Sequence, residues 1–221
     1  MTGEPDNEAP WGEEQWERFM KESDVRSARY GELLETLMDH PERDEIIARE
    51  MGWDRDDEVD DEAEDDWRAE LNEAMNDPLT DEELEEYRRE RGEVEDVPAY
   101  ARSFAWASRV FHSLRPEFES PLDEMSDVDE LFIEALDCRV VAAKIAGGHG
   151  MGYDEDSLCG NIVCCKRSLE AADNSLRALA ELAELRPELR ETIAPLLEEG
   201  RQVRQLVVDR IEELRSQVWW E

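Results

Sequence analysis

The second half of the chain carries apolar residues at the spacing of amphipathic helices. An aromatic-rich stripe covers residues 100–114, and a second stripe follows the candidate capping residues Ser126 and Asp127 and continues to Ile145. A third stripe alternates steps of four and three residues over nearly four heptads: Leu158, Ile162, Cys165, Leu169, Ala172, Leu176, Leu179 and Ala183. This regular seam predicts a long helix that packs against other helices.

A fourth apolar stretch covers residues 189–218, where Pro195 and Gly200 predict a bend or a division near its start. The second and third stretches are joined by a glycine-rich connection at residues 147–152. No run of alternating β-branched residues occurs anywhere in the chain. We therefore predict an all-α fold in which residues 99–219 form an antiparallel four-helix bundle.

The first half predicts further helices with shorter apolar stripes. We expect a helix over residues 11–38, with a gap in its pattern that allows a bend, and a short helix over Glu42–Met51 that ends at Gly52. Helical spacing recurs over residues 59–74, and a capping-box pattern starts another helix over residues 80–91. The acidic run within this half is then the solvated face of a helix.

Charge divides the chain into two regions. Residues 1–100 contain 37 acidic and 11 basic residues, and residues 54–66 alone hold ten carboxylates against one arginine. Because charge density falls after a linker candidate at residues 92–98, we predict an acidic helical region at 1–97 and the bundle at 98–221.

The formal net charge of -36 limits the partners that this protein can meet. Nucleic-acid binding depends on lysine and arginine neutralising phosphates, and anionic lipid attracts the same residues, so we expect neither direct nucleic-acid binding nor membrane binding. The acidic surface favours divalent cations and basic proteins. The 3 lysines against 22 arginines fit either adaptation to high salt or a GC-rich genome, and the sequence leaves both open.

The chain shows no targeting or membrane-spanning pattern. Its first ten residues are acidic and lack the apolar core of a signal peptide, and its longest strongly apolar run is Val140 to Ala143. A cytoplasmic location is therefore the expectation, in which the four cysteines stay reduced.

Two acidic pairs carry the only enzyme hypothesis. Glu134 and Asp137 share one predicted bundle helix, and Glu170 and Asp173 share the next, so four carboxylates could converge on Mg²⁺. The pattern is similar to that of all-α nucleotide pyrophosphohydrolases, which use Glu-x-x-Glu followed by Glu-x-x-Asp, although the first pair here ends in aspartate. This resemblance implies a Mg²⁺-dependent phosphohydrolase. The alternative is an ordinary set of surface ion pairs, Lys166 with Glu170 and Asp173 with Arg177.

The remaining candidate residues lie at the ends of the predicted bundle helices. His149 and Met151 fall in the glycine-rich connection and form a possible functional loop, and His149 with Cys159 and Cys164 could form a soft-metal or redox site. The glycine spacing lacks the lysine and hydroxyl residue of a phosphate-binding loop. We expect Cys138 and Cys165 in the core, and Gly160 at a close approach of the second and third bundle helices. Trp219 and Trp220 are expected either at an interface, or capping the bundle or docking the amino-terminal helices, and the bundle itself is a possible homodimer unit.

The favoured function is therefore a non-enzymatic, acidic, cytoplasmic helical bundle that serves as an interaction or scaffold module for a basic partner, without a cofactor. The alternative is the Mg²⁺-dependent nucleotide pyrophosphohydrolase. A third hypothesis is solvation in brine, which predicts stability that rises sharply with KCl.

Overall fold

The computed structural model describes residues 9–53, 80, 85, 94–118 and 126–220, and these form an all-α helical bundle fold without a strand. The predicted fold class is confirmed. The acidic run at 54–66, the predicted helix at 59–74 and nearly all of the predicted helix at 80–91 lie outside the described residues. None of the described helices combines the length and the apolar character that crossing a membrane requires.

The chain divides into two compact units. One joins residues 1–17 to residues 92–221, and the other comprises residues 18–91. The first turn of helix α1 (Glu13–Thr36) therefore belongs with the bundle, as do residues 92–98, the predicted linker. The sequence suggested one boundary at residues 97 and 98.

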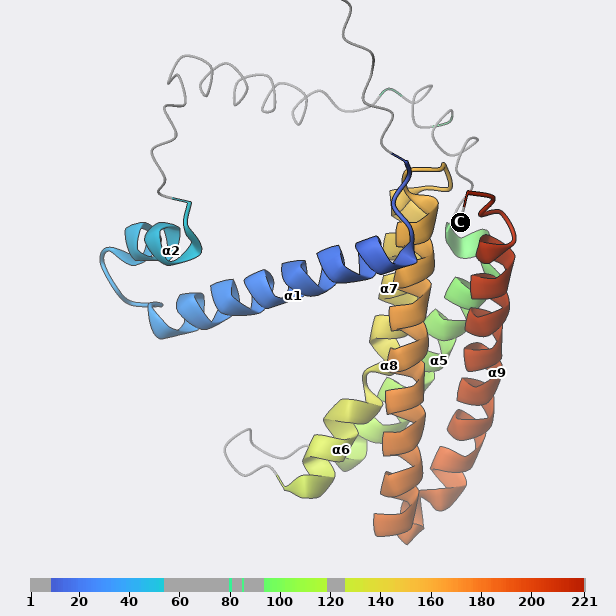
Figure 1. Ribbon diagram of the computed structural model, residues 1–221. Helices are drawn as coiled ribbons and strands as arrows, with labels where there is room; N and C mark the ends of the chain where they lie inside the picture. Colours follow the sequence, from blue (N-terminus) through green and yellow to red (C-terminus); the bar gives the residue numbers. More distant parts are fainter. Residues whose placement is uncertain (1–8, 54–79, 81–84, 86–93, 119–125, 221) are drawn as a thin grey trace, which may run out of the picture. The chain divides into compact units, whose positions relative to one another are not determined.

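Five α-helices of the described residues form the bundle (Figure 1). They are α5 (Pro98–Leu114), α6 (Asp127–Ala135), α7 (Cys138–Met151), α8 (Leu158–Leu185) and α9 (Arg190–Arg215). Helix α8 packs against α6, α7 and α9, while α5 packs against α7 and α9. Short 3-10 helices accompany them: η1 (Val94–Asp96), η2 (Arg115–Glu117) and η4 (Pro187–Leu189). The bundle is closed because α5, α7 and α9 each pack against two other helices and α8 packs against three.

The second predicted bundle helix consists of two helices, α6 and α7, that separate at Leu136 and Asp137. Ser126 starts α6 with a capping box, since its hydroxyl accepts from the Asp129 N–H and the Asp129 carboxylate accepts from the Ser126 N–H. At the break, the Ser175 hydroxyl of α8 donates to the Ala135 carbonyl over 2.6 Å. This bond satisfies an acceptor at the end of α6.

The prediction of a glycine-rich loop at residues 147–152 is wrong for most of its length, because α7 continues through Met151. Only Gly152 takes a conformation that favours glycine, with a φ of 117°. At Gly148 a Cβ atom would lie 2.6 Å from Asn161 Oδ1 and 3.1 Å from the Asn161 carbonyl oxygen. Gly148 therefore lets α7 and α8 approach closely, which is a packing role inside a helix.

Of the bend or division predicted for the last stretch, the division is wrong, because α9 is one helix from Arg190 to Arg215 with Pro195 inside it. The missing N–H of Pro195 leaves the Glu191 carbonyl without its usual helical donor, and both residues are exposed, so water can bond to it. Gly200 makes room for the indole of Trp106, whose Nε1 donates to the Leu196 carbonyl over 2.9 Å.

The predicted seam of α8 lies in the core. Leu158, Ile162, Cys165, Ala172 and Leu179 are buried, and the other predicted seam residues pack partly buried against the same cluster. Polar side chains also lie in this interior, and they are satisfied: Ser168 donates to the Val141 carbonyl over 3.0 Å, as Ser175 does to Ala135. The core is thus continuous between all the bundle helices.

The second unit contains the remainder of α1 and helix α2 (Arg43–Met51). The expected helix over residues 11–38 is confirmed, and its pattern gap does not interrupt it. Helix α2 ends at Gly52 as predicted, with a φ of 70° and the Gly52 N–H bonded to the Arg49 carbonyl. Leu33 and Ile47 are the buried residues of these two helices.

Candidate functional site

A groove lies between the beginning of α5 and the C-terminal half of α9, and we call it the α5–α9 groove. Its volume is about 290 Å³. The residues that line it are Asp96, Val97, Pro98, Ala99, Leu206, Asp209, Arg210 and Glu213. Four are apolar, three are carboxylates and one is a guanidinium. The groove therefore combines an apolar surface with an excess of negative charge.

Two of the three carboxylates are available to a ligand. Asp96 and Asp209 are exposed, and in the described part of the chain neither takes part in an ion pair. Asp209 accepts a hydrogen bond from the Gln205 side-chain amide over 2.8 Å. Asp96 ends the short helix η1, whose turn is closed by the Val97 N–H donating to the Val94 carbonyl. Both carboxylates are therefore carried on ordered backbone.

The single cation of the groove is already engaged. Arg210 Nη1 lies 2.7 Å from Glu213 Oε2, and its Nη2 donates to the Tyr153 hydroxyl over 2.9 Å. The guanidinium carbon also lies 5.4 Å from the centroid of the Tyr153 ring. Because Arg210 neutralises Glu213, the charges of Asp96 and Asp209 remain as the net charge of the groove.

His149 bonds to Tyr153, the residue that holds Arg210 in place. Its Nδ1 shares a hydrogen bond of 2.5 Å with the Tyr153 hydroxyl, which joins α7 to Arg210 on α9. Met151 lies beside Cys164, with Sδ and Sγ 3.8 Å apart. The two residues predicted to form a functional loop therefore occupy the last turn of α7, and His149 positions the Tyr153 hydroxyl, which accepts from Arg210, a lining residue of the α5–α9 groove.

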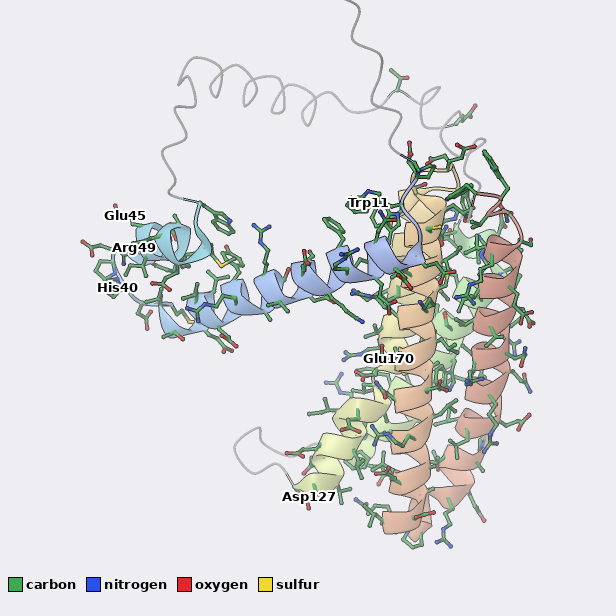
Figure 2. The ribbon with its side chains drawn as sticks, viewed as in Figure 1. Trp11, His40, Glu45, Arg49, Asp127 and Glu170 are labelled. Atoms are coloured by element: carbon green, nitrogen blue, oxygen red, sulfur yellow. The ribbon has the colours of Figure 1, made fainter. Side chains whose placement is uncertain are left out.

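The four acidic residues of the Mg²⁺ hypothesis lie on α6, α8 and the junction before α7. Glu134 accepts from Arg177 Nη2 over 3.1 Å, and Asp173 accepts from Arg204 Nε over 2.6 Å. Glu170 is exposed on α8 (Figure 2). Burial and, to a smaller extent, the nearby Glu134 raise the pKa of Asp137.

Arginines therefore already engage two of the four carboxylates. The expected partner of Asp173 was Arg177, and the structure replaces it by Arg204 of α9. No group of three or more His, Cys, Asp and Glu residues in the described ranges is placed to hold a metal ion. The Mg²⁺ site stays a prediction.

All four cysteines are buried, and none of them forms a disulfide. The core positions predicted for Cys138 and Cys165 are confirmed, and burial raises the pKa of each thiol to about 12. Burial also raises the pKa of Cys164. A thiol with a raised pKa is a poor nucleophile and metal ligand at neutral pH, so the packing of these residues favours a structural role.

The two C-terminal tryptophans differ in burial. Trp219 is 72% exposed, whereas Trp220 packs against the bundle core, and their ring centroids lie 5.7 Å apart. The capping and interface hypotheses therefore each fit one member of the pair.

The first turn of α1 contacts the bundle through ion pairs that no sequence pattern predicts. Glu13 accepts two hydrogen bonds from Arg215, at 2.6 and 2.7 Å, and lies 3.4 Å from Lys166 Nζ. The bond from Arg215, followed by its charge and that of Lys166, lowers the pKa of Glu13 against the effect of burial. A Cβ atom at Gly160 would clash with Cε of Met151 in α7, so the predicted close packing of α7 and α8 at Gly160 is confirmed. Such an atom would also lie 3.0 Å from the Trp16 indole, so α1 packs at the same position.

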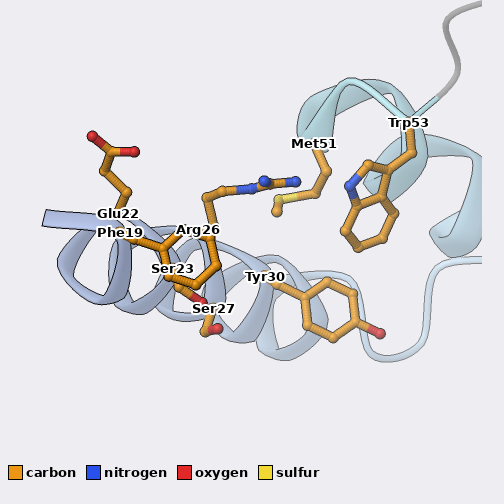
Figure 3. A pocket seen from close by; sticks show the side chains of 8 residues that line it. All are labelled: Phe19, Glu22, Ser23, Arg26, Ser27, Tyr30, Met51 and Trp53. Carbon is orange, nitrogen blue, oxygen red and sulfur yellow. The ribbon is translucent and has the colours of Figure 1, made fainter. Parts of the chain in front are cut away.

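A second groove of about 370 Å³ lies within the unit of residues 18–91 (Figure 3). The rings of Phe19, Tyr30 and Trp53 line it with Met51, and the rings of Tyr30 and Trp53 lie next to each other (Figure 3), with their centroids 5.5 Å apart. Its charged lining residues are one glutamate and one arginine, Glu22 and Arg26. Their charges cancel, so this groove does not select a ligand by net charge.

Comparison with known proteins adds no relative: no protein-family model, no curated protein and no solved structure matches this chain.

Proposed function

We propose that this protein is a non-enzymatic cytoplasmic helical bundle that acts as an interaction or scaffold module for a basic protein partner. The observation that carries the proposal is the net charge of -36 on a chain whose bundle has a continuous apolar core. A folded body with this charge attracts cationic surfaces and accelerates their association.

The same charge selects the kind of partner. Phosphate backbones and anionic lipids are negatively charged, as this protein is, and are therefore repelled. Proteins with basic surfaces or basic tails are the partners that this charge favours. The α5–α9 groove supports the proposal locally, because two of its carboxylates have no cation paired with them in the described part of the chain.

A titration of the full chain with a lysine- and arginine-rich peptide tests this function. We expect binding that weakens steeply as salt rises from about 0.01 M to about 0.15 M, because the Debye length falls from about 30 to about 8 Å. A peptide of the same length with glutamates in place of the basic residues is the control and should not bind. Affinity that does not change with salt, or an absence of binding at low salt, would contradict the proposal.

A further inference from the structure

We propose that the α5–α9 groove binds one long basic side chain, a lysine or an arginine, presented by an extended segment of the partner. This inference rests on the proposed function and assigns it a place on the bundle. Its basis is the combination of an apolar lining with carboxylates that lack a cation.

The apolar lining fits the stem of such a side chain. Val97, Pro98, Ala99 and Leu206 provide the apolar surface, and the methylene groups of lysine and arginine bury readily against surfaces of this kind while the charged head stays polar. The volume of about 290 Å³ lies at the small end of ligand pockets, which suits one side chain better than a folded element.

The charges fit the head group. Arg210 is only 14% exposed and is held by Glu213 and Tyr153, so it does not neutralise Asp96 or Asp209. The two free carboxylates belong to different elements, η1 and α9, and line the same groove. A cation bound between them would form charge-assisted hydrogen bonds with both.

Other ligand classes fit this groove less well. An anionic group would meet three carboxylates and one guanidinium that is already bonded. The described carboxylates of the groove also do not form a group placed to hold a metal ion. The groove lined by Phe19, Tyr30, Met51 and Trp53 has no net charge, so it lacks the excess of carboxylates that the α5–α9 groove offers.

Two double variants of the full chain separate the groove from the general charge of the protein. Asp96→Asn with Asp209→Asn removes both free carboxylates of the groove. Glu184→Gln with Glu191→Gln removes the same amount of charge from exposed positions at the far ends of α8 and α9. All four side chains are exposed, so neither variant should disturb the core, and the helical circular dichroism of each should match the parent.

Binding of a lysine-containing peptide is then measured by calorimetry at low salt. We expect about a tenfold loss of affinity for the groove variant and less than about a twofold loss for the control variant, because directly paired charges contribute more than distant screened ones. Acetylation of the peptide lysine should produce a loss as large as that of the groove variant. Chemical-shift changes should also be seen at the methyl groups of Ala99 and Leu206.

The outcomes distinguish the two proposals. Equal losses for the two variants, or unchanged binding of the acetylated peptide, would overturn the groove assignment and leave the general function in place. A parent protein that binds no basic peptide at low salt would overturn the proposed function and this inference with it.

Discussion

Individual glycines show how closely the bundle helices approach. Gly147 and Gly148 are neighbours in α7, yet a Cβ atom at Gly147 meets nothing within 4 Å, whereas one at Gly148 meets Asn161 and Cys164 of α8 at 3.1 Å or less. One of the Asn161 contacts is to its backbone, which moves less easily than a side chain. The two positions therefore form a matched pair.

We predict that Gly148→Ala lowers the free energy of unfolding by about 1 to 3 kcal/mol, since overpacking costs this much in a tight core. Gly147→Ala should raise it by about 0.5 to 1 kcal/mol, because alanine is the better helix former. Urea unfolding followed by circular dichroism measures both. If Gly148→Ala raised the free energy of unfolding as much as Gly147→Ala, the result would contradict the close packing of α7 against α8 at Gly148.

The four buried thiols give a second prediction at the same scale. Because the folded chain keeps all four cysteines from solvent and raises the pKa of Cys138 and Cys165 to about 12, native protein at neutral pH should react with a thiol reagent only as fast as it unfolds. In urea all four should react at once. Counting modified thiols by mass spectrometry over time tests this, and rapid labelling of native protein would show an accessible thiolate.

The cysteines also show what a stripe of apolar residues can predict about a single side chain. Cys138 and Cys165 lie on predicted seams and were assigned to the core correctly. Cys159 and Cys164 lie off the α8 seam and are buried all the same. A heptad seam describes contact with one partner helix, whereas the N-terminal part of α8 is also covered by Met151 and by Trp16.

At the scale of elements, the first turn of α1 is held to the bundle by charge. Glu13 has its folded pKa below its usual value of 4.5, so its contribution to stability is present above that pH and is lost as pH falls through the lowered pKa. Glu13→Gln should lower the free energy of unfolding at neutral pH by about 1 kcal/mol, since Arg215 stays half exposed to water.

The difference between Glu13→Gln and the parent should therefore shrink in acid and vanish below the lowered pKa. Urea unfolding at several pH values measures it. Glu14→Gln, an exposed neighbour, is the control and should show a small difference at every pH. A Glu13→Gln effect that grew in acid would contradict the ion pair with Arg215 and Lys166.

The sequence predicts which segments form helices more accurately than it predicts the residues at which those helices begin and end. Positions and faces of α5, α8 and α9 follow from their apolar spacing, but the spacing continues across Leu136 and Asp137 and hides the break between α6 and α7. The glycines of 147–152 were assigned to a loop because glycine is common in loops. Close packing requires glycine equally, and only the neighbouring helix reveals which requirement applies.

At the scale of the whole molecule, the net charge of -36 should make stability depend on salt. Self-repulsion destabilises the compact state and is screened by ions, so Tm should rise as KCl increases and then level off. NaCl should act equally, because screening depends on ionic strength. A Tm that fell or stayed constant would contradict the idea that charge repulsion within the chain limits its stability. A rise in Tm that continued to very high KCl would favour the brine hypothesis.

Magnesium tests the competing enzyme hypothesis. We expect no Mg²⁺-dependent hydrolysis of nucleotides, and we expect Glu170→Gln with Asp173→Asn to leave the response of Tm to MgCl₂ unchanged, because Arg204 already engages Asp173. Phosphate release and calorimetric melting measure the two quantities. Turnover that this double variant abolished would establish the carboxylates as a catalytic metal site.

The α5–α9 groove could not be found from the sequence. Asp96 lies in a segment that was considered as a linker, and Asp209 lies on the last helix, with no pattern that relates them. Only the packing of α5 against α9 brings their backbones together. The sequence does predict the sign of the surface and the class of partner, because net charge needs no tertiary information.

The bond between Glu13 and Arg215 joins side chains that are 202 residues apart in the sequence. At a synthesis rate of about 5 to 20 residues per second, Arg215 is translated roughly 10 to 40 s after Glu13. The first turn of α1 cannot form this ion pair before then. Trp16, which covers Gly160, waits through most of the same interval. Until Gly160 has been translated, Trp16 lacks the surface on which it packs in the folded protein. The acidic residues translated in the meantime should repel neighbouring nascent chains on the same polysome.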